Sequence, residues 1–185
     1  MASRVCPWWF GYALIGPVRR WFQDPAKILR GHVSPGMTVL EPGPGMGFFT
    51  LELARLVGPH GRVVAVDVQE RMLAALRRRA ERAGVAARVE TRRATNASMG
   101  VEDLAAQVDF VLAFAVVHEV PDPVSFFRDV RRVLGPAGRV LLAEPLRHVT
   151  EAKFAMTLDE AATAGLRTAH LAGIPHSRAA VLVAK

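Results

Sequence analysis

Three glycines and two acidic residues between positions 41 and 67 have the spacing of a nucleoside-binding site. The glycines follow a short apolar run at 38–40 and precede a segment at 48–57 that is expected to be helical. They are Gly43, Gly45 and Gly47. Such a turn lets the backbone approach a ligand closely, and the following helix presents unpaired N–H groups to it. A second apolar run at 62–66 leads to Asp67, about 20 residues beyond the turn, where a carboxylate can accept both hydroxyl hydrogens of a ribose.

The spacing of the glycines decides which cofactor the turn suits. A dinucleotide-binding turn has glycine at its first, third and sixth positions, but here Phe48 occupies the sixth. Glu41 lies two residues before the first glycine, where negative charge would repel a diphosphate and attract an ammonium group. S-adenosylmethionine carries an amino-acid end and a sulfonium and has no phosphate. The pattern therefore predicts S-adenosylmethionine and argues against a nucleotide-dependent oxidoreductase.

The pattern E-x-G-x-G-x-G followed by Asp67 resembles the class I S-adenosylmethionine-dependent methyltransferases, from about Pro35 to the C-terminus. The resemblance implies an α/β fold with a Rossmann-like, doubly wound sheet of seven strands in the order 3-2-1-4-5-7-6. It also implies that residues 35–185 form the methyltransferase domain.

Alternation of apolar strands and amphipathic helices supports a parallel sheet covered on both faces. Beyond Asp67 we expect helices at 69–83, 123–134 and 150–164, and strands at 88–91, 108–115, 139–143, 166–171 and 179–184. The connection Gly173–His176 is too short for a helical crossover, so the last strand should run antiparallel.

Ligands of such sheets lie at the carboxyl ends of the strands, which selects the candidate cofactor-binding residues. They are Glu41, Gly43, Gly45, Gly47, Asp67, Val68, Met72, Asn96 and Ala115. Val68 and Met72 are expected to flank the adenine, and Ala115 to offer backbone near the methionine part. The resemblance places Asn96 near the adenine, while an ordinary turn asparagine is the alternative.

Methyl transfer needs little more than a nucleophile held in line with the methyl group, but a hydroxyl or amine acceptor benefits from a general base. His118 and His148 are the catalytic candidates, since they follow neighbouring strands, and the second of those strands ends at Glu144. Polar loop residues are the alternative reading of both histidines. No metal is expected, because the chain lacks H-x₃-H and paired-cysteine spacings. Known arsenic-methylating relatives use several cysteines, whereas this chain has only Cys6.

Residues 1–34 precede the expected domain and are rich in aromatic side chains. Trp8, Trp9, Phe10 and Tyr12 lie close together in the sequence. An exposed aromatic patch of this kind would promote aggregation, so we expect these side chains to be buried against another surface. We expect residues 1–34 to form a lid that lines the acceptor pocket; a dimer contact and a membrane-interface contact are the alternatives.

Composition indicates one small intracellular enzyme domain. The 185 residues are 51% hydrophobic, enough for a single core, and no run approaches the ~20 apolar residues that span a bilayer. The single cysteine excludes an intramolecular disulfide, which favours a reducing, cytoplasmic setting. The net charge of +7 would suit a protein that binds nucleic acid, but much of it falls at outward helical positions. The sequence also has no basic segment with interspersed aromatic residues that could stack on bases. Those outward positions include Arg71, Arg77, Arg78, Arg79 and Arg82.

These features together predict an S-adenosylmethionine-dependent methyltransferase that acts on a small-molecule acceptor. A nucleic-acid methyltransferase and a non-catalytic S-adenosylmethionine-binding partner subunit are the alternatives.

Overall fold

The computed structural model describes residues 23–95 and 98–185, which form two compact units. We call residues 23–100 the N-terminal unit and residues 101–185 the C-terminal unit. Their strands belong to one seven-stranded sheet with the order β3-β2-β1-β4-β5-β7-β6. This order confirms the predicted Rossmann-like fold.

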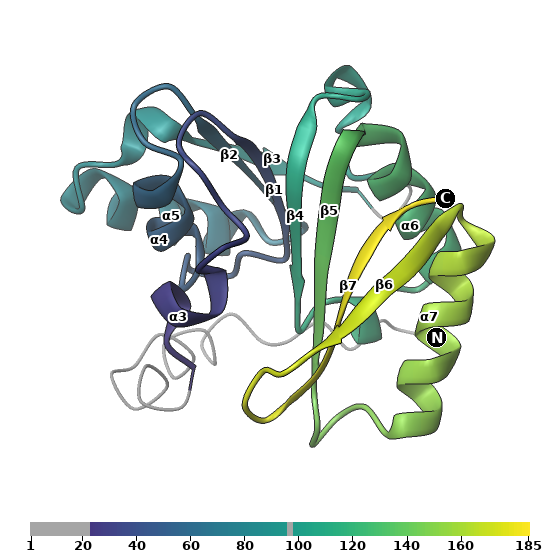
Figure 1. Ribbon diagram of the computed structural model, residues 1–185. Coiled ribbons are helices and arrows are strands. Elements are labelled where there is room, and N and C mark those ends of the chain that lie inside the picture. Colours follow the sequence, from purple (N-terminus) through teal and green to yellow (C-terminus); the bar gives the residue numbers. More distant parts are fainter. Residues whose placement is uncertain (1–22, 96–97) are drawn as a thin grey trace. The chain divides into compact units, whose positions relative to one another are not determined.

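The N-terminal unit is a parallel three-stranded layer with helices packed on it. It contains β1 (Thr38–Pro42), β2 (Arg62–Asp67), β3 (Val89–Arg93), α3 (Pro25–Leu29), α4 (Thr50–Leu56), α5 (Glu70–Arg82) and the 3-10 turn η2 (Ala86–Arg88). Strand β2 pairs with β1 and β3, both in parallel. Figure 1 shows α4 and α5 on one side of these strands. Helix α5 matches its predicted range because Met72, Leu73 and Leu76 recur at helical spacing and are all buried.

Helix α4 begins at Thr50, two residues later than predicted. The cause lies in the preceding turn, where Gly43, Gly45 and Gly47 all have positive φ angles. The N–H of Gly47 donates to the carbonyl of Pro44 at 2.9 Å, which closes a turn in place of a helical bond. The chain therefore enters the helix only after the glycines.

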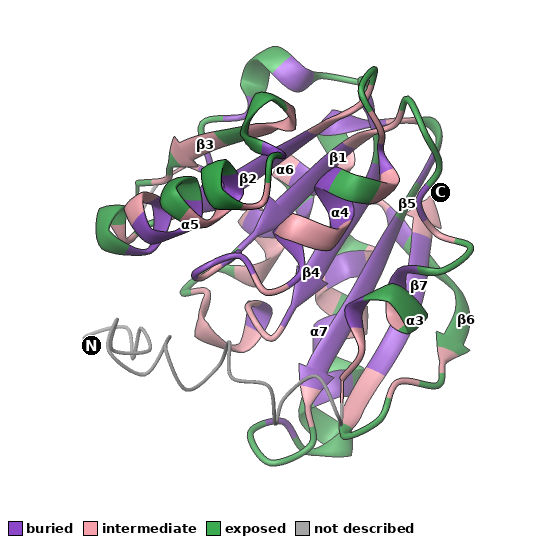
Figure 2. Ribbon diagram, turned by 90° about the vertical axis from the view of Figure 1, so that its left-hand side faces the viewer, coloured by how far each residue is buried: buried purple, intermediate pink, exposed green. Residues whose placement is uncertain are grey.

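The C-terminal unit is a mixed four-stranded layer. It contains β4 (Val108–Phe114), β5 (Leu134–Pro145), β6 (Leu166–Ala172), β7 (Ser177–Ala184), α6 (Pro123–Val133), α7 (Glu151–Thr163) and the 3-10 turns η3 (Glu102–Leu104) and η4 (Val117–Glu119). Strands β4 and β5 run parallel, whereas β7 pairs antiparallel with both β5 and β6, as predicted for the last strand. Figure 2 shows β4, β5 and β7 mostly buried and β6 mostly exposed. Helix α6 begins as predicted at Pro123, and the side chain of its N-cap Asp122 accepts from the Ser125 N–H at 3.0 Å.

Strand β5 begins at Leu134, five residues before its predicted start at Arg139. Val108 pairs with Leu134 and Phe110 with Arg139, so the extra residues of β5 form an irregularity against β4. Gly138 permits this close approach, because a Cβ on it would lie 2.8 Å from the carbonyl oxygen of Val108.

Within residues 23–95 and 98–185, no helix has the length and apolar character that crossing a membrane requires.

Candidate functional site

The glycine turn lies at the carboxyl end of β1 in the N-terminal unit. The Gly43 N–H donates to the carbonyl of Val66 in β2 at 2.8 Å, which ties the start of the turn to the neighbouring strand. A Cβ added to Gly45 would meet no atom of the described residues within 4 Å, so among these residues this part of the backbone is open to a ligand. A Cβ on Gly47 would lie 2.3 Å from Cδ1 of Leu76, so Gly47 is needed to pack the turn on α5. The glycines thus have two different roles. Gly45 leaves room for a ligand to approach the backbone, and Gly47 allows the turn to pack on α5.

Helix α5 also holds the turn through a side chain that the sequence did not single out. The guanidinium of Arg79 donates to the carbonyl oxygen of Met46. We expected Arg79 to lie on a solvated helix face, but it is only partly exposed and contacts the turn. The signal was its spacing: Arg79 follows Leu76 by three residues and therefore shares the helix face that packs on Gly47.

Two carboxylates flank the turn on neighbouring strands. Glu41 lies in β1, is 3% exposed and pairs in register with Ala65. Asp67 ends β2, and its Oδ1 accepts the Gln69 N–H at 2.8 Å, which orients the carboxylate at the start of α5. In the same unit the side chain of Val68 is exposed.

Met72 is buried in a cluster with Met46 of the turn and Ala75 of α5. It therefore supports the glycine turn from beneath. An apolar side chain at this place suits the predicted neighbourhood of an adenine ring.

The chemistry of these residues fits S-adenosylmethionine. An open backbone at Gly45 and acidic residues on the two adjoining strands suit a ligand with an ammonium group and ribose hydroxyls. The guanidinium of Arg79 contacts the carbonyl of Met46, so it supports the turn itself. A diphosphate would bring negative charge beside Glu41.

In the C-terminal unit, the carboxyl end of β4 carries a strained residue. Ala115 has a φ of 55°, a left-handed conformation that residues with a Cβ rarely adopt. Its N–H donates to the carbonyl of Ala143 in β5 at 2.7 Å, which holds this conformation in place. The strained residue directs the chain into η4, which carries His118. Backbone strain of this kind clusters at functional sites.

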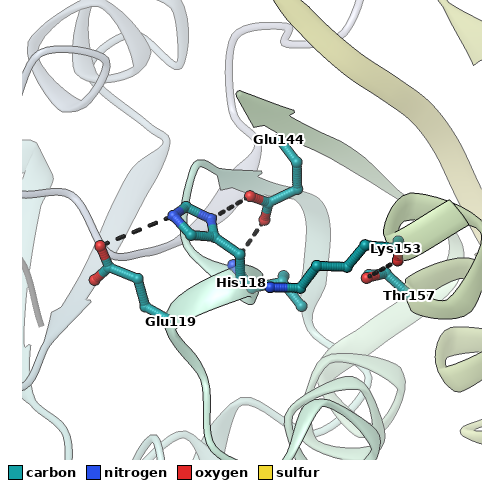
Figure 3. A network of polar contacts seen from close by, with 6 residues as sticks. His118, Glu119, Glu144, Lys153 and Thr157 are labelled. Atoms are coloured by element: carbon teal, nitrogen blue, oxygen red, sulfur yellow. Dashed lines mark hydrogen bonds and ion pairs between the residues drawn. The ribbon is translucent and has the colours of Figure 1, made fainter. Parts of the chain in front are cut away.

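His118 belongs to a network of polar contacts with two glutamates (Figure 3). Its Nδ1 is hydrogen-bonded to Oε2 of Glu144, and its Nε2 lies 3.9 Å from Oε1 of Glu119. Oε1 of Glu144 accepts the Val117 N–H at 2.8 Å. The side chain of His118 is 12% exposed and that of Glu144 only 1%. Sequence reasoning noted Glu144 at the end of its strand but gave it no role.

The second candidate histidine lies beside the first. The ring centroids of His118 and His148 are 5.6 Å apart, and the rings meet edge to face at 78°. His148 is exposed and follows β5, while His118 follows β4. The parallel pairing of β4 with β5 brings the two histidines together.

Five predicted site residues fall outside the residues that the structure describes. They are Trp8, Trp9, Phe10, Tyr12 and Asn96. In the described part of the chain, no three His, Cys, Asp or Glu side chains are grouped in a way that could hold a metal ion.

The fold and these residues define a class of protein, and comparison with known proteins gives the family. Residues 33–176 match a family model described as a methyltransferase domain, which covers most of the chain. The protein belongs to this methyltransferase family, and its fold is that of the class I S-adenosylmethionine-dependent enzymes. The cofactor of this class is S-adenosylmethionine.

Individual relatives agree with this assignment. The chain is 35% identical over 112 residues to an arsenite methyltransferase of Halobacterium salinarum, a match that covers 60% of this chain and 28% of that protein. It is 33% identical over 119 residues to the ubiquinone/menaquinone biosynthesis C-methyltransferase UbiE of Escherichia coli, covering 64% of this chain and 47% of that protein. The chain thus spans less than half the length of these two curated relatives.

A solved structure matches over nearly the whole chain. The S-adenosylmethionine-dependent methyltransferase from Aquifex aeolicus superposes with a TM-score of 0.84 at 25% identity. The match covers 97% of this chain and 100% of that one.

Proposed function

We propose that this protein transfers the methyl group of S-adenosylmethionine to a small-molecule acceptor by in-line displacement. The observation that carries the proposal is the open glycine turn between two acidic strand ends, in a chain of the methyltransferase family. S-adenosylmethionine supplies a methyl carbon on a sulfonium, a leaving group good enough that the protein need mainly orient the acceptor.

The N-terminal unit supplies most of the residues that would hold the cofactor. We assign the ammonium end to Glu41 and the ribose hydroxyls to Asp67. The backbone around Gly45 would approach the chain that joins them, and Val68 and Met72 would flank the adenine. Asn96 and the backbone of Ala115 complete the proposed set.

The proposal also names the residues that would act on the methyl acceptor and line its site. We assign catalytic roles to His118 and His148, which the structure places in ring contact. We also propose that residues 1–34 act as a lid over the acceptor, with Trp8, Trp9, Phe10 and Tyr12 lining it. Support for a small-molecule acceptor comes from the names of the relatives, one an arsenite methyltransferase and others quinone-biosynthesis enzymes. The single cysteine disfavours arsenite as the acceptor, because soft arsenic is best held by several thiolates.

Calorimetric titration with S-adenosylmethionine, S-adenosylhomocysteine and NAD in parallel tests the cofactor assignment. We expect both adenosyl ligands to bind and NAD not to bind. Asp67→Ala should weaken S-adenosylmethionine binding by roughly 1.5–3 kcal/mol, or roughly 10- to 150-fold, because a charge-assisted hydrogen bond is lost. Asp159→Ala, on the exposed side of α7, is the control and should bind as the wild type does.

Two results would contradict these assignments. Binding of NAD alone would overturn the reading of Glu41 and of the glycine spacing. An unchanged affinity in Asp67→Ala would remove the ribose assignment while leaving the cofactor itself in place.

The alternatives are separated by turnover. Methylation of members of a small-molecule panel supports the proposal, whereas cofactor binding without turnover of any acceptor favours a non-catalytic partner subunit. A nucleic-acid methyltransferase would bind a duplex or RNA oligonucleotide with an affinity that falls steeply with salt.

A further inference from the structure

We propose that Glu144 is a positioning residue that holds His118 in the Nδ1–H tautomer of a general base, and that the acceptor therefore loses a proton when it is methylated. This inference rests on the proposed methyl transfer and adds a residue and a substrate class to it. It is carried by the contacts of a carboxylate that is almost entirely buried.

Burial of Glu144 requires a reason, because a carboxylate loses its hydration at a large cost unless hydrogen bonds replace it. Its side chain is 1% exposed at the end of β5. Both oxygens have partners, and both partners belong to η4: Oε1 accepts the Val117 N–H, and Oε2 contacts Nδ1 of His118. One carboxylate thus holds the backbone and the ring of the same short turn.

The contact with Glu144 determines which ring nitrogen of His118 carries hydrogen. An ionised carboxylate is only an acceptor, so Nδ1 must be the donor. In the neutral ring, Nε2 then has a lone pair and can accept a proton. A carboxylate behind a histidine fixes its tautomer and orientation in this way.

Two further side chains surround the ring. The exposed ring of His148 meets it edge to face. Oε1 of Glu119 lies 3.9 Å from Nε2, so a second carboxylate stands beside the nitrogen that would take up the proton.

The presence of a base indicates what the acceptor must lose. When an acceptor atom that carries hydrogen is methylated, its electron pair forms the new bond to carbon, the carbon–sulfur bond of the sulfonium breaks and its electron pair goes to sulfur. The acceptor atom is left positively charged unless its hydrogen departs as a proton. Nε2 of His118 takes that proton as the bond forms, and the imidazolium later releases it to water. An acceptor that reacts through an existing lone pair and loses no proton gains nothing from this arrangement.

The tautomer of His118 can be observed directly, without any acceptor. Long-range ¹H–¹⁵N correlation spectra of the ¹⁵N-labelled full chain distinguish Nδ1–H from Nε2–H rings. The chain has six histidines, so the His118 signals are assigned by their loss in His118→Asn. At about pH 8.5, where an ordinary histidine is neutral, we expect the Nδ1–H tautomer in the wild type.

Glu144→Gln should reverse the tautomer. The amide oxygen stays with the Val117 N–H, and the amide nitrogen then donates to Nδ1 of His118, which moves the ring hydrogen to Nε2 and removes the lone pair. Glu81→Gln, an exposed glutamate of α5, is the matched control and should leave the His118 spectrum unchanged. The wild-type spectrum alone remains decisive if Glu144→Gln does not fold.

An Nε2–H or doubly protonated ring in the wild type overturns the proposal, as does an unchanged tautomer in folded Glu144→Gln. With a hydroxyl or amine acceptor that the wild type methylates, Glu144→Gln should lower kcat by roughly 10²-fold or more and leave KM nearly unchanged. Equal kcat in both proteins would also refute the role of Glu144. Failure of the wild type to bind S-adenosylmethionine would instead count against the proposed function. The spectra of His118 are recorded without the cofactor, so the two failures can be distinguished.

Discussion

Replacing Gly47 with alanine tests whether this glycine packs the cofactor turn against α5. The added Cβ would lie 2.3 Å from Cδ1 of Leu76, a side chain with no exposed surface. Overpacking a buried contact of this kind costs about 1–3 kcal/mol. The φ of 84° adds about 1–2 kcal/mol, because a residue with a Cβ is strained in the left-handed region. We expect Gly47→Ala to lower the free energy of unfolding by about 2–5 kcal/mol.

Gly45→Ala provides a control within the same turn. Gly45 also has a positive φ, of 55°, but in the part of the chain that the structure describes a Cβ there would meet no atom within 4 Å. It should therefore show the backbone strain without the overpacking. Urea unfolding followed by far-UV circular dichroism measures both variants, and Gly47→Ala should be the less stable by about 1–3 kcal/mol.

A double variant identifies Leu76 as the source of the difference. In a Leu76→Ala background the clash is gone, so the cost of Gly47→Ala should fall to that of Gly45→Ala. Equal losses for the two single variants would refute the packing role of Gly47. A cost for Gly47→Ala that is unchanged in the Leu76→Ala background would show that some other contact is responsible.

Two further predictions concern contacts that hold elements near the proposed site. Arg79→Met keeps the aliphatic stem but loses the hydrogen bond to the Met46 carbonyl, so it should destabilise the protein by about 1 kcal/mol in urea unfolding. The control Arg78→Met, on the exposed face of α5, should have little effect, and equal losses in the two variants would contradict the role of Arg79. Asp122→Ala removes the side chain that caps α6 at the Ser125 N–H and should cost about 1 kcal/mol, while Asp122→Asn should restore most of it; no loss in the alanine variant would refute the cap.

The sequence by itself determined the features that depend on nearby residues. The glycine turn, the acid at the end of each of the first two strands and the Asp122–Pro123 start of α6 are all short-range patterns, and they were sufficient to predict the fold and the cofactor. The antiparallel last strand was also predictable, because a short connection excludes a helical crossover.

Tertiary structure decided the contacts between distant residues. Arg79 reaches the carbonyl of Met46, 33 positions away, and Glu144 reaches His118, 26 positions away. Neither pair has a sequence pattern, because the partner of a polar side chain depends on which helix face or strand end lies beside it. The irregularity in β5 is similar: its register against β4 depends on packing at Gly138 and the Val108 carbonyl. Local spacing thus identified the cofactor turn, whereas the partner that sets the protonation form of His118 came only from the pairing of β4 with β5.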